Sequence, residues 1–307
     1  ALHWPDVTVD AITTVYGNVP LARASANARY SVEFCGQTTP VYEGCVRPLL
    51  RPAVHAEWFH GADGMGKLGQ LQPQRPAAEK HAVEELIRRF RAAPGAITLV
   101  TLGPLTNLAA ALSIEPRLAG WVKECYIMGG NANCVGNVTP AAEFNIYADP
   151  EAAHVVFTCG RPIVMMGLDV TRKANATAEM VAKVRSLGNP QAILFAEMME
   201  FFAKSQKEVF GWDAPPLHDP TCIAWLIDPT CFTTKPMRVE IELRGSLTYG
   251  RTSCDYFGLE HQEGPGKELY EGGGALARPT GPNAEVAVDV DFEKFWKIIY
   301  DCCALYK

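Results

Sequence analysis

Apolar stretches alternate with amphipathic stretches over the first two thirds of the chain. Val7–Tyr16 and Ile97–Leu102 are rich in β-branched residues, and each leads through a turn into a helical pattern, at Leu21–Phe34 and Leu105–Leu112. The same alternation continues with a strand at Tyr126–Met128, a helix at Glu151–Phe157 and a strand at Ile163–Gly167. Strands that are apolar throughout are typical of a sheet covered on both faces. The pattern therefore predicts an α/β fold with a mainly parallel central sheet flanked by helices.

The last third of the chain has a different pattern. It predicts helices at Ala192–Val209, Thr221–Ile227 and Phe292–Leu305. A further strand is predicted at Glu285–Val290, before the last of these helices. Val239–Leu243 and Leu247–Cys254, joined by Arg244-Gly245-Ser246, predict a small β-hairpin. Residues 258–283 are rich in glycine and poor in apolar residues, which indicates an insertion. Because no linker or repeat divides the chain, we expect residues 1–307 to form a single domain.

Composition and charge narrow the functional class. The 307 residues are 48% hydrophobic and 20% charged, as in an ordinary globular protein, and the net charge of −6 offers no general basic surface for nucleic acid. No apolar run approaches the roughly 20 residues that cross a membrane. The ten cysteines include no C-x-x-C pair, which favours free thiols over structural zinc or disulfides. We therefore expect a cytoplasmic protein.

A glycine-rich string in the first quarter of the chain suggests one alternative function. Gly64–Gly69 matches the G-x-G-x-x-G pattern of dinucleotide-binding loops. Such a loop works only between a strand and a helix, and the residues that follow this string contain proline and no helical pattern. The context therefore argues against a nicotinamide-dependent oxidoreductase.

Polar residues gather where the predicted strands end. In open α/β sheets, ligands bind beyond the carboxyl ends of the strands. Four clusters fit this rule: Thr13–Asn18, Leu99–Pro104, Met128–Asn131 and Leu217–Pro220. A fifth segment, Asn137–Asp149, adds further amides and a carboxylate. Together they offer carboxylates, amides, a histidine and free carbonyls, which suits a hard cation and a polyhydroxylated ligand.

Several strings in these clusters, in the same order along the chain, resemble one enzyme family. They are TTVYGN (Thr13–Asn18), FHGADGMG (Phe59–Gly66), LGPLTNLA (Leu102–Ala109), MGG (Met128–Gly130), GNVTPAAEFNIYADPEAA (Gly136–Ala153), GLDVT (Gly167–Thr171) and LHDPTCIAWLIDP (Leu217–Pro229). The sequence resembles the calcium-dependent nucleoside hydrolases of the inosine-uridine-preferring type. The resemblance implies hydrolysis of a ribonucleoside to ribose and free base by water bound to Ca²⁺, through an oxocarbenium-like transition state. It also implies a homo-oligomer, a dimer or a tetramer.

The chain departs from this family at its beginning. The family opens with a strand and an aspartate-rich loop of the form D-x-D-P-G-x-D-D, which supplies calcium ligands and the general base. No such string occurs here, and Asp10, expected in the middle of a strand, is no substitute. We expect this segment to belong to the native protein and to precede Ala1. If the native protein also lacks it, the alternative is an inactive nucleoside- or ribose-binding protein.

The resemblance assigns two metal ligands and two catalytic histidines. The ligands are the Asp219 carboxylate and the Leu102 carbonyl, and the histidines that face the base are His218 and His60. The residues alone allow simpler roles. Asp219 before Pro220 is typical of a helix N-cap, and either histidine could be an ordinary loop residue.

The resemblance also implies contacts with the sugar and the base. The ribose contacts are Asn18, Met128, Asn137, Glu143 and Asn145, for which turn formation or core packing are the alternatives. Gln206 and Phe210 lie four residues apart on one predicted helix, so both point to one face, where the family contacts the base. A glutamine at this place favours pyrimidine nucleosides. An ordinary amphipathic helix is the alternative.

Overall fold

The computed structural model describes residues 1–66, 72–258 and 281–306. Its main sheet has five strands in the order β3 (Thr98–Thr101), β4 (Glu124–Met128), β5 (Ile163–Met166), β9 (Ala284–Val290) and β6 (Phe232–Met237). The first four strands are parallel to their neighbours, and β6 pairs with β9 in the antiparallel sense. The predicted α/β fold with a mainly parallel sheet is therefore confirmed.

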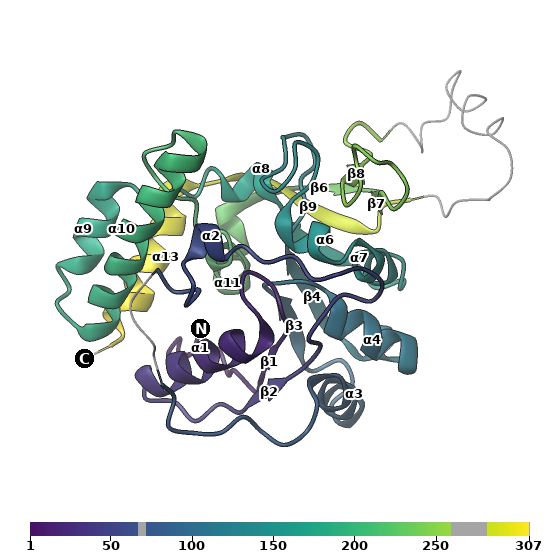
Figure 1. Cartoon of the computed structure of the whole chain (residues 1–307), viewed down its shortest axis with the longest axis horizontal. Coiled ribbons are helices and arrows are strands. Elements are labelled where there is room, and N and C mark those ends of the chain that lie inside the picture. The colour runs from purple at the N-terminus through teal and green to yellow at the C-terminus, as the bar shows by residue number, and fades with distance from the viewer. Residues whose placement is uncertain (67–71, 259–280, 307) are drawn as a thin grey trace, which may run out of the picture.

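Helices cover both faces of this sheet (Figure 1). They are α1 (Leu21–Phe34), α2 (Glu57–His60), α3 (Ala82–Ala92), α4 (Thr106–Ile114), α5 (Leu118–Trp121), α6 (Phe144–Ala148), α7 (Pro150–Phe157), α8 (Leu168–Thr171), α9 (Ala178–Arg185), α10 (Pro190–Phe210), α11 (Pro220–Ile227) and α13 (Phe292–Ala304). In Figure 1, α9, α10 and α13 gather on one side of the molecule and α3, α4 and α7 on the other. None of the helices in the described ranges is long and apolar enough to cross a membrane.

The two faces of the sheet bury two separate cores. Successive side chains of a strand point to opposite faces. Accordingly, Cys125 and Ile127 of β4 pack with α3, α4 and α7, whereas Tyr126 and Met128 pack with α9, α10, α11 and α13. Burial on both faces explains why the strands read as unbroken apolar runs.

The N-terminal strands form a sheet of their own. β1 (Ile12–Thr14) pairs with β2 (Val41–Glu43) in the parallel sense, and within the described residues neither strand joins the main sheet. The expected strand Val7–Tyr16 is therefore much shorter, and the placement of Asp10 within it was wrong, because Asp10 precedes β1.

Side chains of α4 and its neighbours link this small sheet to the rest of the protein. The Asn107 amide donates to the Thr14 carbonyl at 3.0 Å and accepts from the Cys45 amide at 2.8 Å. The Tyr16 hydroxyl donates to the Ala148 carbonyl at 3.1 Å. Gly44 is required beside Asn107, since a Cβ there would lie 2.2 Å from its amide oxygen.

The predicted hairpin forms with a longer connection than expected. β7 (Val239–Ile241) pairs antiparallel with β8 (Thr252–Cys254), so the turn is not the short Arg244-Gly245-Ser246 loop but the whole stretch between these strands. Glu242 organises its start by accepting from the amides of Arg244 and Gly245. The glycine-rich insertion predicted at 258–283 falls mostly on residues 259–280, outside the described ranges.

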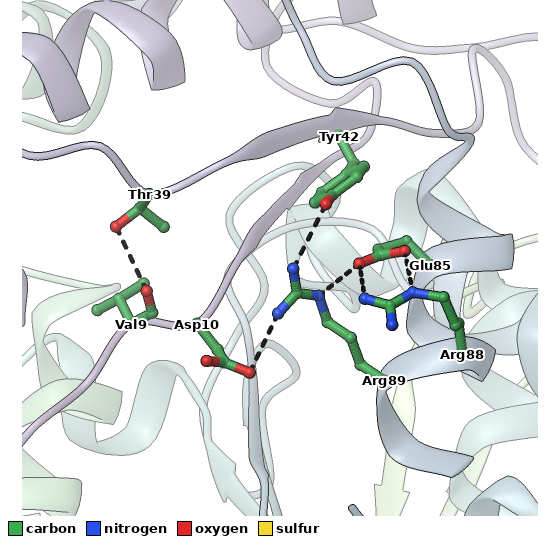
Figure 2. A network of polar contacts seen from close by, with 7 residues as sticks. All are labelled: Val9, Asp10, Thr39, Tyr42, Glu85, Arg88 and Arg89. Atoms are coloured by element: carbon green, nitrogen blue, oxygen red, sulfur yellow. Dashed lines mark hydrogen bonds and ion pairs between the residues drawn. The ribbon is translucent and has the colours of Figure 1, made fainter. Parts of the chain in front are cut away.

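A charged cluster ties α3 to the N-terminal strands (Figure 2). Both oxygens of Glu85, a side chain only 1% exposed, accept from Arg88 at 2.6 and 2.7 Å, and one also accepts from Arg89 at 2.6 Å. Arg89 in turn reaches Asp10 at 3.1 Å and the Tyr42 hydroxyl at 3.4 Å. The hydrogen bonds from the guanidinium groups lower the pKa of Glu85 to about 2.

Glu85→Gln should lower the free energy of unfolding by about 1–3 kcal/mol at pH 7, because neutral glutamine cannot accept both guanidinium groups as a carboxylate does. Since the pKa of Glu85 is lower in the folded state, its stabilising effect is complete above pH ~4.5 and is lost as the pH falls toward 2. Urea unfolding at pH 7 and at pH 3 measures both effects. Glu84→Gln, on the exposed side of the same helical turn, is the control. Equal effects of the two substitutions would contradict the assignment.

Candidate active site

The ends of several strands meet at one edge of the fold. Leu102 follows β3 and Met128 ends β4, the next strand of the sheet. The turn after β1 approaches this edge closely, since a Cβ on Gly17 would lie 3.2 Å from the Pro104 ring. Three of the selected segments, those that contain Gly17, Leu102 and Met128, therefore lie at the carboxyl edge of the sheet.

Glu143 is held beneath this edge by backbone amides. It is the N-cap of α6, where its side chain accepts from the Ile146 amide at 3.2 Å, and the same oxygen accepts from the Gly130 amide at 3.0 Å. Gly129 permits this approach, since a Cβ there would lie 3.2 Å from that oxygen. The side chain is only 2% exposed, and burial raises the pKa of Glu143 to about 7 despite these hydrogen bonds.

The nearby asparagines each use one side-chain atom to organise the site. Asn145 is buried, and its amide nitrogen donates to the Met128 carbonyl at 3.1 Å and contacts the Met128 sulfur at 3.2 Å. The Asn137 oxygen accepts from the Phe144 amide at 2.9 Å. Met128 is itself buried in the core. The turn and packing roles considered for these residues are thus real, and each asparagine keeps its other polar atom for a ligand.

Asp219 does not cap the helix that follows it. Its backbone is already helical and its carboxylate accepts no hydrogen bond from α11, so the N-cap role is not realised. The residue is exposed, yet the protein around its carboxylate, together with the negative charge of Glu143, raises the pKa of Asp219 to about 7. The two carboxylates therefore share one electrostatic environment.

Two neutral histidines lie near each other in the site. Burial, with smaller electrostatic contributions from His60 and Arg172, lowers the pKa of His218 to about 3. Burial alone lowers the pKa of His60 to about 4. His218 Nδ1 lies 2.8 Å from the Thr171 hydroxyl. Both rings are therefore uncharged at neutral pH and can serve only as hydrogen-bond donors or acceptors there.

Aromatic rings surround His60. The Phe59 ring lies 5.1 Å from His60, 6.2 Å from Phe202 and 6.1 Å from Phe210, measured between ring centroids. Phe210 also stacks on Trp212 at 5.4 Å. These contacts join α2 to the C-terminal part of α10 and form an apolar wall that suits a flat heterocycle.

The remaining predicted residues lie at different depths. Gln206 is buried on α10, one turn before Phe210. Asn18 is exposed after β1, and its carbonyl accepts from the Ala56 amide at 2.9 Å. Leu102 is 42% exposed, so its main chain is accessible.

The donor set for a metal ion is incomplete in the described part of the chain. Ca²⁺ takes six to eight oxygen ligands. Asp219 and the Leu102 carbonyl supply suitable oxygens, but the described residues contain no group of three or more Asp, Glu, His or Cys side chains that could hold an ion. The oxygens of Asp219 and Leu102 are of the type that Ca²⁺ prefers, but two ligands do not make a calcium site.

The sequence analysis missed three residues that support the site. Thr171 contacts the His218 ring, and Asp169 holds the loop after Asn131 by accepting from the amides of Ala132 and Asn133 at 2.6 and 2.8 Å. Thr252 of the hairpin donates to the Asn131 carbonyl at 2.6 Å and accepts from its amide at 2.8 Å. Asp169 and Thr171 lie in the GLDVT string, which was the available signal.

The Gly64–Gly69 string does not have the context of a dinucleotide-binding loop in its described part. A short helix, α2, precedes it instead of a strand. Gly64 and Gly66 have positive φ angles of 72° and 79° and contact Val19 and Phe201. Gly69 lies outside the described residues.

Comparisons with known proteins agree with this arrangement. The family profile of the inosine-uridine preferring nucleoside hydrolases matches residues 1–297. A pyrimidine-specific ribonucleoside hydrolase, RihB, from Shigella flexneri is 37% identical over 306 residues, which cover all of this chain and 92% of the relative.

Two solved structures share the fold along its whole length. A plant nucleoside hydrolase is 32% identical with a TM-score of 0.85, over 99% of this chain and 92% of its own. A purine-preferring ribonucleoside hydrolase from Gardnerella vaginalis is 28% identical, also with a TM-score of 0.85, over 99% and 93%. These matches show that the chain belongs to the inosine-uridine preferring nucleoside hydrolase family.

Proposed function

We propose that this protein hydrolyses the N-glycosidic bond of ribonucleosides, with a preference for pyrimidine nucleosides. The observation that carries the proposal is the Asp219 carboxylate, which caps no helix and lies in the electrostatic field of Glu143, next to the half-buried His218. Membership of the family and the pyrimidine-specific relative support the same reaction.

The chemistry requires opposite charges to be stabilised at two places. As the bond between C1′ and the base nitrogen breaks, positive charge develops on the sugar and negative charge on the base. Asp219 supplies negative charge beside the sugar, and its oxygens accept hydrogen bonds from the attacking water. His218 and His60, both neutral, face the base.

The sugar is held by the polar atoms that the fold leaves available. Asn145 Oδ1 and the second oxygen of Glu143 accept from ribose hydroxyls, while Asn137 Nδ2 and the exposed Asn18 amide complete the set. Hydroxyl groups both donate and accept, so this mixture of amides and a carboxylate selects a polyol over an apolar ligand. Met128 supports Asn145 from beneath.

The base lies against the aromatic wall of Phe59, His60 and Phe210. Phe210 stacks on the ring, and Gln206 pairs with the polar edge of a pyrimidine. The glutamine at position 206 is the feature of this chain that favours uridine and cytidine over inosine.

A bound Ca²⁺ is part of the proposal, with Asp219 and the Leu102 carbonyl as two of its ligands. When bound, such an ion lowers the pKa of water and holds the ribose diol. The described residues do not complete its shell. The roles given above to Asp219, Asn145 and His218 are those of the side chains themselves.

The test uses the protein from its complete gene, assayed with uridine, cytidine and inosine by release of reducing sugar. We expect kcat/KM for the two pyrimidine nucleosides to exceed that for inosine by at least about tenfold, since one well-placed hydrogen-bonding edge is worth that much. A chelator should abolish turnover and added Ca²⁺ should restore it.

Three other results would change the assignment. Binding of uridine by calorimetry without release of ribose would favour the binding-protein alternative. Faster turnover of inosine would overturn the pyrimidine preference. A rise in thermal stability with NAD would favour the alternative of a nicotinamide-dependent oxidoreductase.

A further inference from the structure

We infer that Thr171 fixes the neutral His218 ring in the tautomer that carries its proton on Nε2, and that it thereby makes this ring a hydrogen-bond donor toward the leaving base. The inference rests on the proposed function and adds to it a positioning residue outside the set that touches substrate. It starts from the 2.8 Å contact between the Thr171 hydroxyl and His218 Nδ1.

The hydroxyl of Thr171 has one hydrogen-bond partner in the described part of the chain. Thr171 is 0% exposed at the end of α8, directly beyond the carboxyl end of β5, so water cannot satisfy it. Within the described residues, the only recorded hydrogen bond of its hydroxyl is the one to His218 Nδ1. The direction of this single bond therefore decides whether the hydroxyl proton is satisfied.

The two possible directions are not equivalent. If Nδ1–H donated to Thr171, the hydroxyl proton would be buried without an acceptor, which is a costly arrangement. If the hydroxyl donates to an unprotonated Nδ1, the buried hydroxyl proton has its acceptor. In a neutral imidazole, the proton then lies on Nε2. Nε2 is also the ring nitrogen that Thr171 leaves available for a ligand.

Other contacts hold the backbone of His218 without fixing its ring. The Thr221 hydroxyl donates to the His218 carbonyl at 2.6 Å, and the Thr221 amide donates to the same carbonyl at 3.2 Å. Arg172, the neighbour of Thr171, is occupied by the carbonyls of Val135 and Gly136 at 2.7 Å each. The orientation and tautomer of the ring therefore depend on Thr171.

An Nε2–H donor helps the reaction without giving up its proton. As the C1′–N1 bond breaks, its electron pair moves to the pyrimidine, and negative charge spreads to the carbonyl oxygens of the base. The hydrogen bond from Nε2–H stabilises this charge. Water adds its oxygen to C1′, and the proton that water loses neutralises the released base. His218 remains a neutral ring throughout.

The test compares Thr171→Val, which keeps the shape and removes the hydroxyl, with Thr171→Ser, which keeps the hydroxyl. Substrates are uridine and p-nitrophenyl β-D-ribofuranoside, whose nitrophenolate leaves as a stable anion and needs no donor. For Thr171→Val we expect kcat on uridine to fall about 10- to 100-fold with KM nearly unchanged. The fall on the nitrophenyl riboside should stay within about threefold, and Thr171→Ser should recover most of the uridine activity.

Thr221→Val is the matched control, because it removes a buried threonine hydroxyl that contacts the backbone of His218 instead of its ring. It should affect both substrates equally. The ¹⁵N spectrum of histidine-labelled protein, with His218 assigned from its Ala variant, should show a protonated Nε2 in the wild type and a mixture in Thr171→Val.

Equal losses on both substrates in Thr171→Val, or a wild-type spectrum with the proton on Nδ1, would overturn the inference. Failure of the proposed function gives a different result, since the wild-type protein would then hydrolyse neither substrate. If Thr171→Val does not fold, the Ser variant and the wild-type spectrum still decide the matter.

Discussion

Asp219→Asn should reduce kcat/KM for uridine by about 10²–10³-fold, the size expected when one preorganised charged group is lost from an active site. Asparagine keeps the volume of the side chain but removes its negative charge. The fold should tolerate this change, because the carboxylate of Asp219 makes no cap hydrogen bond. Steady-state kinetics with uridine measures the loss.

The same variant should be at least as stable as the wild type in the presence of a chelator. Because the folded-state pKa of Asp219 is raised to about 7, its ionised form costs stability, and this cost grows as the pH rises from about 4 to 7. Thermal unfolding at pH 8 measures the difference. Asp213→Asn, an exposed carboxylate on the same connection that pairs with Lys207, is the control and should leave turnover unchanged. Full activity of Asp219→Asn would contradict the assigned role.

His218→Ala should lower kcat on uridine by about 10²–10⁴-fold, the range for loss of a group that assists at the leaving atom. The pKa of His218 is lowered to about 3, so this ring stays neutral from pH 5 to 8. The wild-type kcat should therefore show no inflection from His218 in that range, and a pH profile of both proteins checks this point.

His154→Ala, an exposed histidine at the end of α7, is the control for this variant and should keep wild-type activity. An inflection near pH 6.5 that disappears only in His218→Ala would show that the ring titrates during turnover. That result would contradict the neutral donor role.

Much of the fold could be predicted from periodicity. The expected helix Leu21–Phe34 has the predicted bounds, and the buried strands and the final helix lie within a few residues of theirs. The predicted strand Val7–Tyr16 was too long, because β-branched residues near Asp10 suit an unpaired extended segment as well as a paired strand. Only pairing with β2 defines the bounds of β1. The hairpin was predicted correctly, but the length of its connection was not. Glu242 organises this connection by accepting from backbone amides, which the sequence pattern does not reveal.

The candidate site was predictable in part for a related reason. Leu102 and Met128 come together because neighbouring parallel strands end at one edge. Glu143 and Asn145 belong to the start of α6 and reach this edge through hydrogen bonds to Gly130 and Met128. The position of Thr171 could not be inferred in the same way. A threonine in a short apolar helix carries no sign of its partner, and His218 lies 47 residues away along the chain. Such a contact is fixed only by tertiary packing.

The small sheet of β1 and β2 has a consequence for the dynamics of the protein. No strand ladder within the described residues joins it to the main sheet, and its links include the Asn107 amide and the Tyr16 hydroxyl. Side-chain links of this kind break more easily than a row of backbone bonds, so the small sheet forms a separate cooperative unit. Its amide protons should exchange with solvent through partial opening, while those of β4 and β5 should exchange only through global unfolding.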